Sequence, residues 1–417
     1  MSSTQPEIFG IGKVQIGGET TFNTAASNLD DVQVKGHDRS GLDRPVLEDM
    51  SQRQGLYQKA PIAGLQRGQI VLTGYIHGFS TSDPGAEPSH TKVHNAGADG
   101  FDQILGIFGG ALGDVVSGSY EAAPITYAAK TITSTDLSNF VAGQACAWAT
   151  GSTPAYEVGW ITDRNGSTTV DVFHTPEVDP QTGAGAKLWG SHTVWVDDGS
   201  REYIDSAGSS GPTSWTVKIF GAADDDVTTC TGCHPTALKL NFPAGELPTW
   251  EMTLGVGAFT EAGSGGGPDK ITWSYPSPEP IGNGNTRAVW GDDSGNSQRI
   301  IHNLVVDFGL TVNPIRDLNK SGGIGGWIQM ECKPSITFDV LRDVSEEVTD
   351  YGNQTSKAFM LWTGSQPGKM FSVFVPDADI VAFPTWKDGD GAVTAPITLQ
   401  ATCYTGDTYS QTDGAPA

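Results

Sequence analysis

Apolar and polar residues alternate most regularly in the last third of the chain. The alternation runs over 336–340, 371–375 and 397–401. A period of two places one face of a β-strand against a core and the other face in water. We therefore predict strands in these three segments. Between the last two, Lys387–Gly391 carries an Asp-Gly signal typical of a hairpin turn.

Short β-rich segments separated by glycine, proline and polar clusters fill most of the remaining chain. The long polar stretch 80–100 predicts an exposed loop, and 176–190 predicts another. The further predicted strands are 70–79, 128–133, 141–149, 156–162, 168–174, 192–196, 214–219, 237–242 and 250–255.

Helical spacing of apolar residues is clear in one segment. Asp99 can cap a helix there, apolar residues follow at a spacing near 3.6, and Gly113 can end it. A second short helical piece is predicted over 345–351. Each half of the chain thus contains apolar strands, a helical piece and then paired strands, which suggests a coarse duplication.

The pattern predicts a mainly β protein in three segments. Residues 1–60 are polar and are expected to form an N-terminal arm with one or two strands. Residues 61–190 form a first β domain, and residues 191–417 form a second β domain with an irregular insertion near 261–300. The 54 glycines and 24 prolines fit a chain with many turns between short strands.

The charge balance argues against a protein that grips nucleic acid. The chain has 48 acidic and 24 basic residues, for a net charge of −24, and no basic stripe. No run of about 20 apolar residues is present to span a bilayer, and the first residues lack the basic and apolar regions of a signal peptide. Five cysteines without a regular spacing do not predict a disulfide framework, so synthesis in the cytoplasm is expected.

One segment matches a known chemical motif. Cys230, Cys233 and His234 follow the C-x-x-C-H spacing of c-type haem attachment, with two thioether links and an axial imidazole. A zinc site would need a fourth ligand, and a redox-active pair is expected before a helix. We favour a tight glycine turn that leads into the strand 237–242, and we keep haem, zinc and redox roles as weaker alternatives.

No other motif predicts a site. His90 and His94 share a loop, and Asp224–Asp226 could meet calcium, but neither group has a complete ligand set. The sequence contains no H-E-x-x-H, G-x-S-x-G or P-loop pattern. We therefore predict no catalytic residue, no bound cofactor and no metal site, and we do not expect an enzyme.

Several segments together resemble the tail tube proteins, or major tail proteins, of tailed bacteriophages. Gly17–Thr24 is similar to the opening motif of that family, and 62–79 to its first core strands. The glycine-rich segment 105–113 resembles its short helix, and 231–240 its central turn and strand. The end of the chain, 359–399, shows the closest likeness.

This resemblance implies a tail-tube-type β-sandwich with a short flanking helix, here in two such domains, with an extended arm and long loops. Subunits of that family form stacked rings around a channel through which DNA passes during genome ejection. The implied partners are other copies in trimeric pseudo-hexameric or hexameric rings, and tail terminator and tail tip or baseplate proteins. Tape-measure protein and DNA would pass through the lumen without sequence-specific binding, and no membrane is involved.

The implied location is the virion tail, after assembly in the host bacterial cytoplasm. The arm at 1–60 and the loop at 80–100 are expected to hold rings together. A secreted carbohydrate-binding β-sandwich module is the alternative function, and an enzyme or haem protein is a third. The sequence leaves open the host, the presence of a contractile sheath, the ring symmetry and the strands that face the lumen.

Overall fold

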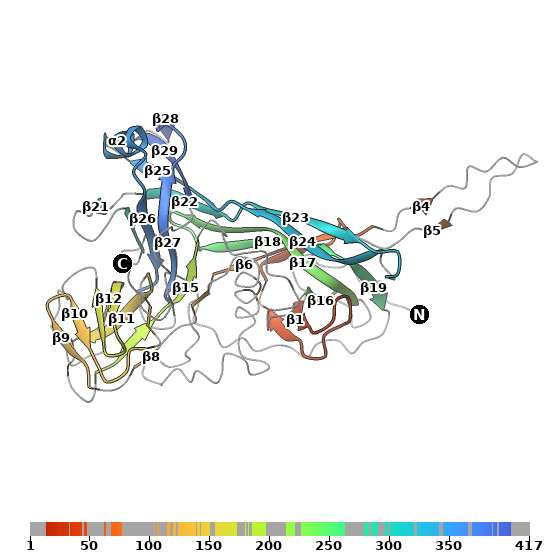
Figure 1. The fold of residues 1–417 in the computed structure, drawn as a ribbon, viewed down its shortest axis with the longest axis horizontal. Coiled ribbons are helices and arrows are strands. Elements are labelled where there is room, and N and C mark those ends of the chain that lie inside the picture. The colour runs from red at the N-terminus through yellow and green to blue at the C-terminus, as the bar shows by residue number, and fades with distance from the viewer. Residues whose placement is uncertain are drawn as a thin grey trace, which may run out of the picture.

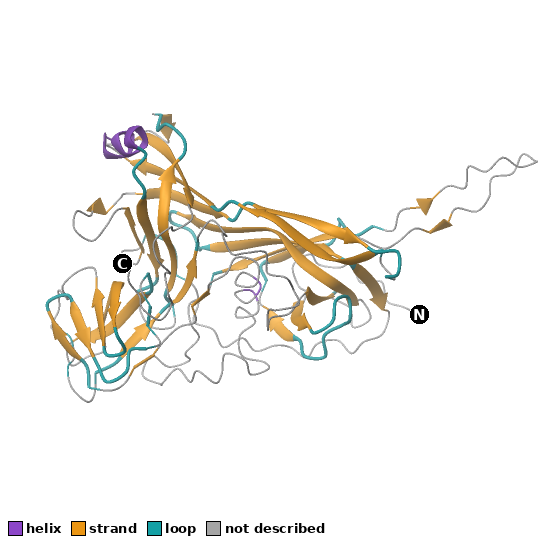
Figure 2. Cartoon of the chain, viewed as in Figure 1, coloured by secondary structure: helices purple, strands orange, loops and turns teal. Residues whose placement is uncertain are grey.

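The protein is built almost entirely of antiparallel β-strands (Figure 2). Among the residues with a defined placement, one helix of nine residues, α2 (Ser345–Asn353), stands at one end. The computed structural model describes residues 14–32, 34–43, 46–47, 62–63, 68–76, 104, 107, 115–116, 120–121, 124–138, 140–141, 143–150, 155–172, 180, 182, 186–196, 214–221, 227–262, 279–282, 286–290, 297–298, 301–320, 323–341, 345–365, 369–385, 387–389 and 392–401.

Most strands belong to two units, which we call the first and second unit. The first unit consists of β1 (Val14–Glu19), β2 (Asp30–Val32), β3 (Gly36–Asp38), β6 (Gly68–Tyr75), β16 (Ser214–Phe220), β17 (Val227–Pro243), β18 (Thr249–Val256) and β19 (Ala258–Ala262). The second unit consists of β20 (Thr286–Trp290), β21 (Ser297–Gln298), β22 (Ile301–Asp307), β25 (Ser335–Leu341), α2, β26 (Lys357–Thr363), β27 (Phe371–Ile380), β28 (Lys387–Gly389) and β29 (Ala392–Ala401).

The two units have the same topology. In the first, the strands pair in the order β3–β6–β18–β17, and in the second in the order β22–β25–β29–β27, always antiparallel. We call these strands the ladder of each unit. Each unit also has a second set of paired strands, which we call the side sheet: β1–β16–β17 in the first unit matches β20–β26–β27 in the second. The strand shared by ladder and side sheet, β17 or β27, is interrupted by bulges in both units.

The strand β17 also pairs with β22, so the two units form one continuous ladder. One row of directly opposed residues crosses seven strands of this ladder, and all of them face the core: Gly74, Trp250, Leu240, Val306, Ile336, Leu399 and Ile380. Side chains of the side sheet, such as Ile16 and Val217, belong to the same core cluster. Each unit is thus two layers around a shared apolar interior.

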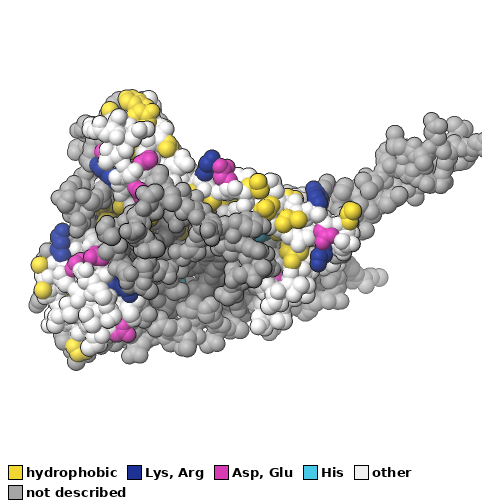
Figure 3. Space-filling model, viewed as in Figure 1, with side chains coloured by type: hydrophobic (Ala, Val, Ile, Leu, Met, Phe, Trp, Pro, Cys, Tyr) yellow, Lys and Arg dark blue, Asp and Glu magenta, His cyan; other side chains and the backbone are white. Residues whose placement is uncertain are grey.

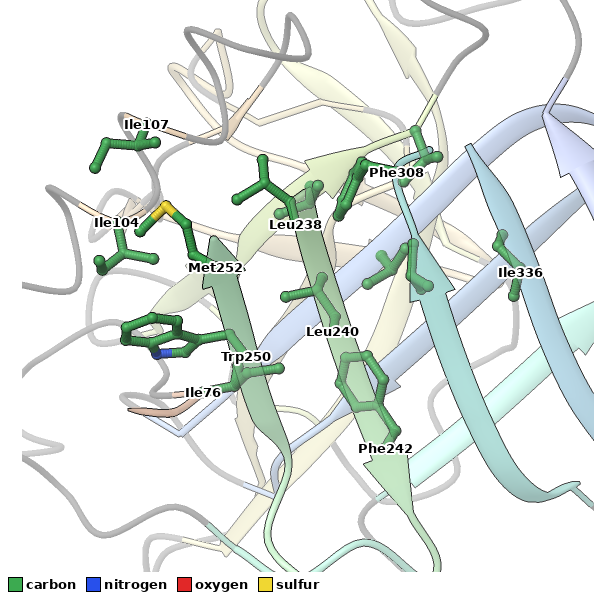
Figure 4. Close-up of a cluster of buried hydrophobic side chains, with 14 of the residues drawn as sticks. Ile76, Ile104, Ile107, Leu238, Leu240, Phe242, Trp250, Met252, Phe308 and Ile336 are labelled. Atoms are coloured by element: carbon green, nitrogen blue, oxygen red, sulfur yellow. The ribbon is translucent and has the colours of Figure 1, made fainter. Parts of the chain in front are cut away.

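Helical residues cover this core near the first unit. Ile104 and Ile107 have helical backbone and are fully buried with the side chains of β17 and β18 (Figure 4). They lie in the segment where apolar spacing predicts a helix, and their position after β6 matches that of α2 after β25. The rest of the predicted helix 99–113 lies outside the described residues.

A separate seven-stranded sheet is inserted between the helical residues and β16 of the first unit. Its core contains Trp148, Phe140 and Ile161, while Trp160 packs on Met360 and Trp362 of the second unit's side sheet. The strands of this insert, in the order β8–β14–β11–β12–β13–β10–β9, are β8 (Tyr120–Glu121), β9 (Thr126–Ala128), β10 (Thr131–Thr133), β11 (Ala145–Thr150), β12 (Ala155–Asn165), β13 (Thr169–Val172) and β14 (Leu188–Gly190). Beside it, β15 (His192–Trp195) pairs parallel with β27 and antiparallel with β7 (Val115–Val116).

Each unit also extends a two-stranded hairpin between its first two ladder strands. In the first unit this is β4 (Val46–Leu47) with β5 (Ile62–Ala63), and in the second β23 (Leu310–Arg316) with β24 (Ile324–Cys332). Both extensions lie at the right of Figure 1, while α2 and the insert lie at the left. The second hairpin crosses β17, because Trp327 Nε1 donates a hydrogen bond of 2.8 Å to the Gly232 carbonyl oxygen.

The mainly β class and most predicted strands are confirmed. The alternating segments lie in β25, β27 and β29, and the helical piece at 345–351 is α2. Gly389 pairs with Ala392, which confirms the hairpin turn between them. The predicted strand 128–133 is wrong as one strand, because Ala129 adopts a positive φ of 54° and the chain reverses there into the hairpin β9–β10.

The strand pairing groups the chain differently from its order in sequence. β6 belongs to the predicted segment 61–190, yet it pairs with β18 and β3 rather than with the insert. Within the predicted arm, Val14 and Ile16 are fully buried in the main core and β1 pairs with β16. Residues 1–13 and the predicted loop 80–100 lie outside the described residues.

Candidate functional site

The segment Cys230–His234 lies inside the long strand β17. The predicted tight turn is therefore wrong: the strand continues through the segment and on to Pro243. Gly232 adopts a positive φ of 60°, and the register against β16 shifts between Trp215 and Val217. A glycine in this conformation inserts an extra residue into the ladder as a bulge, without reversing the chain.

The bulge places both cysteines in the core. Cys230 and Cys233 are free thiols with no exposed surface, opposite Val217 and Trp215 respectively. Burial raises the pKa of the Cys233 thiol well above its usual range, and the neighbouring Cys230 and Glu19 add to the effect. A thiol held protonated is a poor nucleophile and a poor metal ligand.

His234 packs near two indole rings. Its ring lies 6.0 Å from the Trp215 ring and 6.2 Å from the Trp327 ring, and Nδ1 is 2.9 Å from the Pro235 carbonyl oxygen. Burial lowers the pKa of the imidazole. Two fully buried thiols, and an imidazole whose Nδ1 contacts the Pro235 carbonyl oxygen, do not fit a covalently attached haem. In the described parts of the chain, no three His, Cys, Asp or Glu side chains form a metal-binding cluster.

The buried charge nearest this segment is Glu19, to which sequence reasoning assigned no role. Its side chain has no exposed surface. Oε1 accepts hydrogen bonds from Thr216 Oγ1 at 2.8 Å and from the Gly232 amide at 2.9 Å. Oε2 accepts from the Asn23 amide at 2.8 Å and from Ser214 Oγ. One carboxylate thus ties together β1, β16, the bulge in β17 and the turn after β1.

A signal for this cluster exists in the sequence. Ser214 and Thr216 alternate with apolar residues, so both hydroxyls face one side of β16, where a buried acceptor can meet them. The pairing of Glu19 with Ser214, 195 residues apart, is a tertiary feature that local patterns do not reveal. The loop that follows β1 closes over the site, because a Cβ on Gly17 would stand 2.1 Å from the Asn28 carbonyl oxygen.

Hydroxyls and a histidine also gather where the insert meets the second unit. Ser372 Oγ lies 2.9 Å from Ser191 Oγ and 2.7 Å from Thr193 Oγ1, and all three residues are buried. His192 beside them is 2% exposed, and burial lowers its pKa to about 4. These buried hydroxyls bond to one another across the pair β15–β27, which indicates a structural joint between the two strands.

Neither a known protein-family model nor a curated protein matches this chain. No helix in the described parts of the chain has the length and apolar character that a membrane crossing needs.

The face of the ladder opposite the core is polar and acidic. Next to the apolar row, a second row of directly opposed residues crosses the same seven strands: Thr73, Glu251, Lys239, Asp307, Ser335, Gln400 and Asp379. Lys239 is the single basic residue of this row, and its Nζ lies 3.0 Å from Asp307 Oδ2. Three acidic residues thus stand against one basic residue in this row, and Lys239 lies directly between two of them, Glu251 and Asp307.

Within the described part of the chain, no further strand continues the ladder beyond β3 or beyond β27. Among the described strands, β3 pairs only with β6. At the other end, β27 pairs with β29 over Ala378–Ile380, and the Val381 amide donates a further hydrogen bond of 3.0 Å to the Thr398 carbonyl oxygen. On its other edge β27 is paired with β26 as far as Ala378. The exposed apolar residues Val381 and Phe383 follow directly. An open ladder edge is a template for pairing with another chain.

Proposed function

We propose that this protein is the structural subunit of a bacteriophage tail tube, in which stacked rings of subunits surround a channel for DNA. One observation carries the proposal. The ladder has a continuous apolar face and a continuous polar and acidic face, and among the described strands nothing continues it beyond β3 or β27. Such a sheet removes its edges by closing into a barrel with other copies.

The repeated topology bears on the number of copies. Each chain supplies two equivalent four-stranded units joined through Lys239–Pro243 of β17 and Asn303–Asp307 of β22. Three chains then present six equivalent units around one channel. The repeat supports a trimeric ring with pseudo-six-fold symmetry over a hexamer, in which six chains would present twelve units.

The polar face suits a channel for DNA. Glu251, Asp307 and Asp379 outnumber Lys239 in its central row, and Thr337 and Gln400 add uncharged polar surface. Acidic groups repel phosphates, so the duplex would pass without adhering. The core face lies against the side sheets and is the face that points away from the channel.

Electron microscopy of the concentrated protein tests the proposal. We expect rings or tubes with three chains around an open lumen, and native mass measurement should give a smallest ring of three chains. Six chains in one ring would overturn the trimer but keep the tube. A protein that stays monomeric at every concentration and binds oligosaccharides would overturn the tube and support the carbohydrate-binding alternative.

A further inference from the structure

The turn between β12 and β13 of the insert carries an inference about covalent modification. It begins with Asn165 followed by Gly166. We propose that Asn165 is a site of spontaneous deamidation, at which the link to Gly166 passes through a cyclic imide and becomes aspartate or isoaspartate. The reaction needs only water, so it is independent of whether the chain assembles into rings.

The nucleophile and the leaving group both belong to this turn. The Gly166 backbone nitrogen loses its proton to water or hydroxide and forms a bond to Asn165 Cγ. The bond from Cγ to Nδ2 then breaks, and Nδ2 leaves as ammonia with a proton taken from water. Hydrolysis of the imide at one carbonyl gives aspartate, and hydrolysis at the other gives isoaspartate. No electrons are transferred, so the step needs neither an oxidant nor a reductant.

The structure leaves this nucleophile accessible. Residues 165–168 are all exposed. Within the described part of the chain, the Gly166 amide donates no hydrogen bond. The turn is anchored one residue later instead, because the Ser167 carbonyl oxygen accepts a hydrogen bond of 2.6 Å from the Leu137 amide. The nitrogen that must attack is therefore not engaged in holding the turn.

Space for the imide is also available. Gly166 adopts a positive φ of 74°, and apart from its chain neighbours no described atom lies within 4 Å of the position that a Cβ would occupy. The missing side chain lets the backbone nitrogen approach Asn165 Cγ closely. The insert, at the lower left of Figure 3, presents few hydrophobic side chains in this view, as expected for a surface that water reaches.

Deamidation would add a carboxylate beside two existing ones. Asp171 lies directly opposite Asp163 in the pair β12–β13, and its Oδ2 accepts a hydrogen bond of 2.9 Å from Asn165 Nδ2. Conversion of the amide replaces this donor with a second negatively charged acceptor. Like charges on neighbouring strands destabilise their pairing. The modification should therefore weaken the pairing of β12 with β13, and it should leave the ladder unchanged because the insert forms a separate sheet.

Peptide mapping by mass spectrometry tests the proposal on the full-length wild-type protein. The folded protein is aged at mildly alkaline pH beside a synthetic peptide of the sequence 160–170. We expect Asn165 to convert in both, with isoaspartate among the products. Asn319, which is exposed in a turn but followed by Lys320, is the internal control and should keep its amide. Asn283 is also followed by glycine, lies outside the described residues and is mapped in a separate peptide.

The outcomes decide both the site and its consequence. An intact amide at Asn165 in the folded protein, under conditions that convert the synthetic peptide, would overturn the proposal. Asn165→Asp introduces the new charge without ageing, and Asn165→Gln is the matched neutral control that cannot be converted at this position in the same way. Hydrogen exchange in β13 should be up to about fivefold faster in the aspartate variant. Equal exchange in the two variants would overturn the predicted weakening of the pair.

Discussion

Glu19 joins four backbone and side-chain donors of the first unit through one side chain. Its carboxylate accepts four hydrogen bonds and is buried completely. Replacing it with alanine leaves two amides and two hydroxyls without their charged acceptor. We expect Glu19→Ala to lower the free energy of unfolding by about 3–5 kcal/mol in denaturant titrations. Glu246→Ala, at an exposed turn, is the control and should change it by less than about 0.5 kcal/mol.

His192 predicts a pH dependence with a definite sign. Burial holds its folded pKa near 4, whereas an unfolded chain has the ordinary value of 6.5. The unfolded state therefore binds the proton first, and stability is lost as pH falls from about 6.5 toward 4. At pH 5 the loss from this residue should be about 2 kcal/mol relative to pH 7.5. The difference in unfolding free energy between pH 7.5 and 5 should shrink by that amount in His192→Gln; an unchanged difference would contradict the assignment.

At the scale of elements, the hairpin β23–β24 is held on the first unit by a close contact. A Cβ on Gly255 would stand 2.6 Å from the Trp327 ring, and the same indole donates its hydrogen bond to Gly232. Gly255→Ala should therefore displace Trp327 and destabilise the protein by about 1–3 kcal/mol. In a Trp327→Ala background the glycine substitution should cost at least about 1 kcal/mol less. Additive costs in this double-mutant cycle would show that the two residues do not interact as described.

At the scale of the whole molecule, the charge of the polar ladder face should control contact with DNA. Glu251→Lys with Thr337→Lys adds three positive charges to this face, where both residues are exposed. We expect tubes of this variant to retain double-stranded DNA at low salt and to release it as salt rises, because the contacts are with phosphates. Glu246→Lys with Thr260→Lys adds the same charge at exposed positions on a turn and on β19, and should retain far less. Equal retention by both variants would show that total charge, and not the ladder face, governs the interaction.

Local patterns predicted much of the secondary structure because each pattern has a local physical cause. Alternation over 336–340 and 397–401 reflects burial of one strand face, and apolar spacing around Ile104 and Ile107 reflects a buried helix face. The tight turn predicted at Cys230–His234 was wrong because a glycine in a short polar segment is typical both of a turn and of a bulge within a strand. The backbone conformation at Gly232 is the same in either case, so the continuation of the strand depends on partners far away in sequence.

The sequence by itself determined the mainly β class, the position of most strands, the helix α2 and the acidic balance, since these depend on composition and on residues close along the chain. Only the tertiary structure decided how strands combine, because pairing such as β6 with β18 joins segments more than 170 residues apart and is stabilised by a shared core. It alone revealed the repeated order of the two units, the burial of Glu19, and a ladder in which an apolar row and a polar row each cross seven strands. Side chains that alternate along one strand become a continuous surface only when neighbouring strands are set in register, and that register is a property of the folded chain.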